Sequence, residues 1–457
     1  MTKGKVVLAV VIVLLLGSQT IYAQLNTQPN TQPNTQLNTQ FRASDPGPRG
    51  GPADAGGMLP GLTGAEQAMF SSGKEDFESE ETVADGVGPR FNFVSCAGCH
   101  AQPATGGSSP ADNPLFRVAA GGDLGFKNTV PSFITRRGPV REARFQFNSD
   151  GSRDGGVHAL FVITGHAQAP NCNIQQEDFE RQVRNNNIIF RVPTPVFGAG
   201  LIENIADVTI SNNLGDNSFT KSRLGISGRV NRSGNDGTIT RFGWKAQNKS
   251  LVIFSGEAYN VEMGISNEAF QQEREENGNC QFAARPNDVT ASTTELPAIV
   301  KFANFQRFLA APTPSTSGPG SDSSRANGRS KFSSIGCALC HTPQLSTGTR
   351  TVGALSNKDA NLFSDVALHA MGPNLADDIL QGNARGDEFR TAPLWGLGKR
   401  LFFLHDGRST DLIDAIRQHK SSGNSKFGPS EANGVVDNFF NLNEGDKQDV
   451  LNFLRSL

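Results

Sequence analysis

Four of the six cysteines in this chain stand in two copies of one short pattern. The copies are CAGCH at residues 96–100 and CALCH at residues 337–341. Cys-x-x-Cys-His is the attachment pattern of c-type haem, in which the two sulfurs bond to the porphyrin vinyl groups and the histidine reaches the iron. The pattern predicts two covalently bound haem c groups, with His100 and His341 on the irons. The attachment residues are Cys96, Cys99, His100, Cys337, Cys340 and His341.

Two other uses of paired cysteines compete with haem. A thioredoxin-like redox pair needs no histidine after it and prefers a βαβ setting. A structural zinc site could combine the two cysteine pairs, and the histidines would then be incidental. We favour haem because both copies carry the histidine and both follow a segment that resembles a secretory signal.

Residues 1–23 have the three parts of a signal peptide. Lys3 and Lys5 supply positive charge, Val6–Leu16 is an apolar run of eleven residues, and Ile21–Ala23 offers a cleavage site. A membrane span needs about 20 apolar residues, so the run suits a signal better, with an uncleaved anchor as the alternative. We expect a periplasmic or secreted protein with no membrane span after cleavage.

The next segment, residues 24–58, is expected to form a disordered linker. The repeat NTQPNTQPNTQLNTQF fills residues 26–41, and the stretch that follows is rich in proline and glycine. The whole chain has a formal net charge of −2 and contains no basic block. This charge pattern argues against a nucleic-acid partner.

Helix signals flank both cysteine patterns. Thr63 and Glu66 form a capping box before the first pattern, and a polar stretch containing Phe332 and Ile335 leads into the second. The chain ends on a helix whose apolar face comprises Val450, Leu451, Leu454 and Leu457. A helix before each attachment site and one closing the chain are the minimum that a cytochrome c domain needs.

These helices predict a mainly α fold with two cytochrome c-like haem domains, at residues 59–166 and 321–457. Residues 167–320 are expected to form a loop-rich intervening region with some β-hairpins, for example in GISGRVNRSGNDGTITRFGW. Fifty glycines and 24 prolines favour many irregular connections. Cys172 and Cys280, both in loop-like contexts, are expected to form a disulfide outside the cytoplasm, with two buried thiols as the alternative.

The stretch LFFLHDGRSTDLIDAIRQH, residues 401–419, contains two of the seven histidines. Its Asp-Gly pair indicates a tight turn, and Ser409 or Thr410 can cap the helix that follows. On that helix Leu412, Ile416 and His419 share one face. From spacing alone, His419 is either a core residue or an iron ligand.

Several longer segments resemble the bacterial di-haem cytochrome c peroxidase superfamily, and within it the di-haem oxidoreductase family. They run in order along nearly all of the chain after the linker. The segments are GPRFNFVSCAGCHAQPATGG, NTVPSFITRRGPVREARF, VPTPVFGAGLIENI, RFGWKAQNKSLVIFSGEAYN, LFSDVALHAMGPNLAD and FRTAPLWGLGKRLFFLHDGRSTDLIDAI.

The resemblance implies a role for each histidine of the 401–419 stretch. In the superfamily the histidine of the turn, here His405, lies close to the C-terminal haem. The distal ligand of that haem comes fourteen residues later, which is position 419 of this chain. The peroxidases have methionine there, so this chain departs from the pattern, and His341 with His419 would give bis-histidine ligation. Methionine ligation raises a haem's reduction potential; the departure therefore predicts a lower potential and puts a high-potential electron donor in doubt.

The N-terminal haem has fewer candidate ligands. The peroxidases place a displaceable histidine soon after the first motif, but this chain has no histidine between His100 and His158. The iron is expected to be open, or capped by His158 or His166. His158 is also the candidate distal general base, with a structural histidine as the alternative. The loop at residues 150–156 begins with calcium-loop spacing but lacks the closing glutamate, so Ca²⁺ is an optional further ion.

We therefore expect a di-haem oxidoreductase of peroxidase-like kind. The haem of His341 and His419 would transfer electrons from a small redox protein or another donor, and the haem of His100 would act on hydrogen peroxide or oxygen. The alternative is a pure electron-transfer cytochrome with both haems closed. Other branches of the superfamily oxidise other substrates, including a polymer and protein side chains, and family membership does not choose among them.

Overall fold

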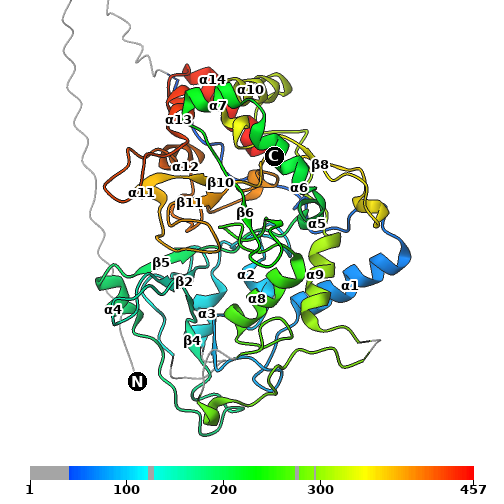
Figure 1. Ribbon diagram of the computed structural model, residues 1–457, viewed down its shortest axis with the longest axis vertical. Coiled ribbons are helices and arrows are strands. Elements are labelled where there is room, and N and C mark those ends of the chain that lie inside the picture. The colour runs from blue at the N-terminus through cyan, green and yellow to red at the C-terminus, as the bar shows by residue number, and fades with distance from the viewer. Residues whose placement is uncertain (1–40, 122–127, 273–276, 293–294) are drawn as a thin grey trace, which may run out of the picture. The chain divides into compact units, whose positions relative to one another are not determined.

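A helix precedes each Cys-x-x-Cys-His turn in the computed structural model, which describes residues 41–121, 128–272, 277–292 and 295–457 (Figure 1). Helix α1 (Gly64–Glu78) begins at the predicted capping box, which is confirmed: Glu66 N–H donates to Thr63 Oγ1 at 3.3 Å, and Thr63 N–H donates to Glu66 Oε2 at 2.7 Å. Helix α10 (Asp322–Ser334) begins at Ser321, whose hydroxyl accepts from Ser324 N–H. The predicted signal peptide lies outside the described residues.

Of the remaining helices, α8, α9 and α14 have 11 to 13 residues and the others are shorter, several of them single turns. The bounds of these helices are α2 (Cys96–Cys99), α3 (Pro114–Gly121), α4 (Phe179–Arg184), α5 (Ala199–Asn204), α6 (Asp207–Gly215), α7 (Ser218–Leu224), α8 (Leu251–Met263), α9 (Ala298–Phe308), α11 (Gly372–Leu375), α12 (Leu412–Gln418), α13 (Asn433–Phe440) and α14 (Glu444–Ser456). Four 3₁₀ turns among the described residues are η1 (Gly278–Cys280), η2 (Cys337–Leu339), η3 (Gly353–Leu355) and η4 (Leu397–Lys399).

The strands form small antiparallel sheets. The largest has the order β3-β2-β5, and the two-stranded pairs are β1-β4, β6-β7, β8-β9 and β10-β11. The bounds are β1 (Arg90–Phe91), β2 (Glu142–Phe145), β3 (Val157–His158), β4 (Phe161–Val162), β5 (Ile188–Arg191), β6 (Asn231–Arg232), β7 (Ile239–Thr240), β8 (Leu345–Ser346), β9 (Asp359–Ala360), β10 (Leu368–Ala370) and β11 (Glu388–Arg390). The β6-β7 pair, with Asn231 opposite Thr240, confirms the predicted hairpin.

The mainly α fold with two cytochrome c-like domains that the helix signals predicted is wrong. Helices account for 32% of the structure and strands for 11%, so turns and irregular segments make up most of it. The physical reason lies in the local sequence: glycine and proline interrupt the chain between the helices that flank the motifs. Residues 42–457 form one compact unit, and the domain boundaries inside it stay predictions. No helix of the described residues is both long and apolar enough to span a membrane.

Helices α1 and α10 each lie in close contact with a later helix, through a glycine. A Cβ added at Gly73 of α1 would lie 2.1 Å from the backbone oxygen of Lys301 in α9. A Cβ added at Gly328 of α10 would lie 1.9 Å from the backbone oxygen of Asp449 in α14. Both crossings therefore require a residue without a side chain.

The two helix pairs repeat further details. A phenylalanine follows each glycine after four residues, and its ring lies beside the motif histidine: Phe77 is 5.9 Å from His100 and Phe332 is 6.4 Å from His341, between centroids. Helices α9 and α14 both carry Asn-Phe-x-Arg, at residues 304–307 and 452–455. Each repeat ends in an arginine that binds a carboxylate. The pairs are Arg307 with Glu203 at 2.8 Å and Arg455 with Asp45 at 2.6 Å.

Two large apolar clusters, and a third of only three residues, form the core of the described residues. The larger extends from Leu62 to Trp395 and includes Phe77, Phe302 and Phe305 between α1 and α9. The smaller joins α10 to the C-terminal helices and includes all four residues of the predicted apolar face on α14, which are buried as expected. Cys172 and Cys280 form the predicted disulfide, which is confirmed, and both cysteines are buried.

Gly328→Ala tests the requirement for glycine at the α10–α14 crossing. Because the new methyl group would overlap backbone that cannot rotate away, we expect the free energy of unfolding to fall by at least about 1–3 kcal/mol. Gly215→Ala is the matched control, since a Cβ there meets no atom within 4 Å. Equal stability of the two variants in denaturant titrations would contradict this packing.

Candidate haem sites

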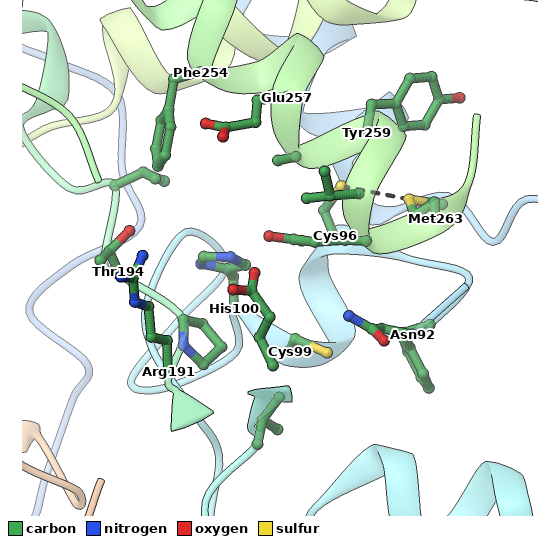
Figure 2. A pocket seen from close by; sticks show the side chains of 18 of the residues that line it. Asn92, Cys96, Cys99, His100, Arg191, Thr194, Phe254, Glu257, Tyr259 and Met263 are labelled. Carbon is green, nitrogen blue, oxygen red and sulfur yellow. Dashed lines mark hydrogen bonds between the residues drawn. The ribbon is translucent and has the colours of Figure 1, made fainter. Parts of the chain in front are cut away.

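The first motif lines a cavity between α2, α8 and the β2–β5 sheet. Cys96, Cys99 and His100 all face it, and Figure 2 shows them opposite side chains from α8 such as Glu257. Burial raises the pKa of both cysteine thiols well above the usual range. Met263 reaches the same wall, with its sulfur 4.0 Å from Cys96 Sγ.

The backbone sets the tautomer of His100. Its Nδ1 lies 3.0 Å from the carbonyl oxygen of Gly107. A carbonyl oxygen can only accept, so Nδ1 carries the proton and Nε2 keeps its lone pair. Burial lowers the pKa of His100 to about 4, which keeps the ring neutral near pH 7. Metal-binding histidines commonly have this arrangement, with one nitrogen held by an acceptor and the other free for the metal.

The second motif lines a separate, mostly apolar cavity between α10, α12, α13 and α14. His341 repeats the geometry of His100: its Nδ1 donates to the carbonyl oxygen of Phe363 at 3.0 Å. Burial again lowers the pKa of His341 to about 4. Cys337 and Cys340 line the same cavity, and burial raises the pKa of Cys337 to about 12.

His419 faces this second cavity as well. It is the C-terminal cap of α12. The N-terminal cap of this helix is Asp411, whose carboxylate accepts from Asp414 N–H, and not Ser409 or Thr410. The Nδ1 of His419 donates to the Ala415 carbonyl oxygen at 2.7 Å, and burial lowers its pKa. His419 thus shares the tautomer and the neutral charge of the two motif histidines.

Two further histidines line the second cavity but differ from His419. His405 stacks on the Phe389 ring at 4.3 Å, and burial lowers its pKa to about 4. Both ring nitrogens of His369 bind carboxylates, Asp365 at 2.9 Å and Glu431 at 2.7 Å. Burial would lower the pKa of His369, but the Cys340 sulfur and Asp365 raise it well above the usual value. His369 is therefore a cation with no free lone pair.

His158 and His166 do not line the first cavity. The ring of His158 stacks on Phe145 at 3.6 Å, and its Nε2 binds Asp154 at 2.8 Å. His166 lies beside a different hollow, where its Nδ1 accepts from Gln168 N–H at 3.1 Å. In the loop at residues 150–156, Asp150 accepts from the backbone and hydroxyl of Ser152. The described residues contain no cluster of three or more metal-binding side chains.

Besides His100, the first cavity is lined by carboxylates and by no second histidine of the described residues. Glu142 pairs with Arg144 at 2.5 Å, and Glu257 accepts from Asn248. Burial, together with the charges of these two glutamates, raises the pKa of Glu262 to about 8, so this carboxyl is protonated at neutral pH. The sequence reasoning missed Glu262. The available signal was its place, with Glu257, in the otherwise apolar segment LVIFSGEAYNVEM.

Trp244 connects the two sites. Of the described residues that line the two cavities, it is the one common to both. Its indole N–H donates to the Val192 carbonyl oxygen at 2.9 Å, and its ring lies edge-on to His405 at 6.4 Å. Trp395, the other tryptophan, is buried in the larger apolar cluster.

Two cavities that each contain a cysteine pair and a neutral histidine with a free Nε2 fit two haem groups. The chain belongs to the di-haem oxidoreductase family: the family model described as "Di-haem oxidoreductase, putative peroxidase" matches residues 143–457. The resemblance found in the sequence is thereby confirmed. The protein is a haem-dependent oxidoreductase of peroxidase-like kind.

Solved structures give only distant similarity. Hydrazine synthase of Kuenenia stuttgartiensis is 13% identical, with 97% of this chain and 99% of that chain covered and a TM-score of 0.33. The dihaem peroxidase BthA of Burkholderia thailandensis is 14% identical, with 85% and 86% covered and a TM-score of 0.39. These TM-scores are too low to support an argument. No curated protein matches the chain.

Glu431→Gln tests the charge pair that holds His369. Burial would raise the pKa of Glu431, but the hydrogen bond and charge of His369 lower it to about 2. The stabilisation is therefore present above the carboxyl's usual pKa, about 4.5, and disappears as the pH falls from there to about 2.

We expect the variant to lose roughly 3 kcal/mol of unfolding free energy at pH 7 and to approach the wild type as the pH falls toward 2. Denaturant titrations at several pH values measure both effects. Glu75→Gln, at an exposed position of α1, is the control. A constant difference across this pH range would contradict the assignment.

Proposed function

We propose that this protein is a periplasmic di-haem c-type oxidoreductase in which one haem stores electrons and the other reacts with hydrogen peroxide or oxygen. One observation carries the proposal. Three histidines donate Nδ1–H to a backbone carbonyl, and two of them face the second cavity while one faces the first. The second cavity would offer an iron two histidine ligands, and the first would offer one.

In the second cavity, His341 and His419 are the proposed ligands and Cys337 and Cys340 the attachment points. Two strong ligands close an iron to small molecules, so this haem is limited to electron transfer. The apolar side chains around it exclude water and thereby limit reorganisation during electron transfer. Trp244, which borders both cavities, is the proposed path for electrons toward the first haem.

In the first cavity, Cys96, Cys99 and His100 would hold the haem. A bound haem iron with one protein ligand supplies redox chemistry on peroxide or oxygen. Reduction of hydrogen peroxide to water consumes two protons as well as two electrons. The carboxyl of Glu262 holds a proton at neutral pH and faces the cavity, so we assign it as the proton donor.

The proposed periplasmic location and the proposed electron donor rest on the sequence and on the expected ligands of the second haem. The signal-like residues 1–23 support export, and covalent haem attachment is an extracytoplasmic process. The electron source is proposed to be a small redox protein or another donor outside the cytoplasm. The low potential expected for a bis-histidine haem favours a low-potential donor.

The alternative function, a pure electron carrier, rests on Met263. Its thioether sulfur lies at the wall of the first cavity, 4.0 Å from Cys96 Sγ, and thioethers ligate haem iron. Optical and electron paramagnetic resonance spectra separate the two functions. A high-spin ferric component and binding of cyanide or carbon monoxide are expected for the oxidoreductase. Two low-spin haems that bind neither ligand would establish the carrier.

His419→Met tests the ligand assignment in the second cavity. We expect the reduction potential of one haem to rise and that of the other to stay nearly unchanged, because methionine favours the ferrous iron. Potentiometric titration followed by optical spectroscopy measures both values. In the control, His405→Ala, both haems should remain bound. Equal shifts of both haems, or none, would refute the assignment.

Glu262→Gln tests the proton donor. We expect peroxide consumption by the reduced protein to fall by roughly 10²–10⁴-fold. A carboxyl with a pKa of about 8 can donate a proton below that pH and not above it, so wild-type activity should decline as the pH rises through 8 and this step should be absent in the variant. A variant with the wild-type rate and pH profile would exclude Glu262 from the reaction.

A further inference from the structure

Two arginines in the second cavity have no partner of opposite charge: Arg390 is buried and Arg400 is partly buried. Arg390 is 8% exposed and donates only to backbone oxygens, those of Gly243 at 3.0 Å and Thr391 at 3.4 Å. The guanidinium of Arg400 has no hydrogen bond or ion pair to another side chain of the described residues. Burial lowers the pKa of each arginine to about 10, and for Arg390 the charge of Arg400 contributes as well.

The other charged groups of this cavity do not compensate the two arginines. Asp365 is the one carboxylate that acts on Arg390, and it is already bound to His369. Glu431 is bound to His369 and to the backbone N–H groups of residues 227, 228 and 370. A buried charge without a counter-ion costs several kcal/mol. Arg390 and Arg400 are therefore placed to bind an anion supplied from outside the chain.

The position of the pair within the cavity indicates which anion this is. Arg390 and Arg400 also border a smaller hollow that they share with Trp244. Neither cysteine of the motif borders that hollow, and neither does His369, which lies 3.8 Å from Cys340. The arginines thus occupy the end of the cavity away from the cysteines. In a haem, the vinyl groups and the two propionate carboxylates lie on opposite edges.

We propose that Arg390 and Arg400 bind the propionate carboxylates of the second haem. The inference rests on the proposed function, because it requires a haem attached through Cys337 and Cys340. A guanidinium pairs with a carboxylate through two parallel hydrogen bonds, and two guanidinium groups match two propionates in charge. The propionate edge of this haem then faces Trp244, toward the first cavity, and the vinyl edge faces α10.

The arginines also affect the potential of the second haem. Positive charge near the iron destabilises the ferric state more than the ferrous state, and it keeps the propionates ionised. Removal of one arginine should therefore lower the potential of the bis-histidine haem. It should also raise a propionate pKa, so that the potential becomes dependent on pH near neutrality. The haem bound through His100 should not change, because neither arginine lines its cavity.

Arg400→Met is the principal test, with haem content and the potential of each haem measured from pH 6 to 9 on the full-length holoprotein. We expect two haems per chain, a lower and pH-dependent potential for the low-spin haem, and an unchanged potential for the other. Arg400→Lys should restore most of the wild-type potential because it keeps the charge. Arg385→Met removes an arginine whose side chain is 64% exposed and should change neither haem.

Two outcomes would overturn the inference: unchanged potentials of both haems, or a shift confined to the haem of His100. Should Arg400→Met fail to fold, Arg400→Gln keeps a polar side chain, and the same fall in potential is expected. Failure of the proposed function has a different signature. A wild-type chain without two covalently bound haems would refute that function, and this inference with it, before any variant is made.

Discussion

An imidazole can offer a lone pair to a metal only when its proton is held on the other nitrogen. In this protein a backbone carbonyl holds that proton on each of three histidines, His100, His341 and His419. Burial then keeps the rings neutral. The carbonyls belong to Gly107, Phe363 and Ala415, so the loops and the helix that carry these residues decide where an iron can bind. His369 is the opposite case. Both of its ring nitrogens bind carboxylates and its pKa is raised, so the ring is positively charged.

The same contrast separates the two cavities. The second combines apolar walls with two histidines whose Nε2 is free, and its two uncompensated charges, on Arg390 and Arg400, are positive. The first combines one histidine with three glutamates, and one of these keeps its proton at neutral pH. Charge and proton supply therefore differ between two sites that share the same attachment turn. This difference supports the proposed roles of the two sites, in which one transfers electrons and the other can also supply protons.

Local features of the sequence were predicted well. The capping box at Thr63, the β6-β7 hairpin, the Cys172–Cys280 disulfide and the apolar face of α14 depend on short-range patterns or on a simple count of cysteines. Family membership was also predicted correctly. The fold class was wrong because helix signals are concentrated around the motifs, whereas turns and irregular segments make up most of the structure.

The interior of the first cavity was beyond prediction for a different reason. Glu262 meets the motif only after α8 packs against α2, and residues more than 160 positions apart come together without any pattern that links them. The sequence also could not predict that Arg390 and Arg400 lack a carboxylate partner. That property depends on which side chains surround each arginine in the folded chain. A signal that could have been read is the repeat of Gly-x-x-x-Phe and Asn-Phe-x-Arg, which marks α1 with α9 and α10 with α14.

That repeat has a consequence for the origin of the molecule. Two helix pairs with the same glycine crossing, the same phenylalanine beside the histidine and the same closing arginine are what duplication of a one-haem ancestor would leave behind. The repeated parts include the phenylalanine beside the motif histidine in each copy. The parts that differ are α12 with His419 in one copy and α8 with its glutamates in the other. After a duplication, the two copies would therefore have diverged mainly in the side chains that line the rest of each cavity.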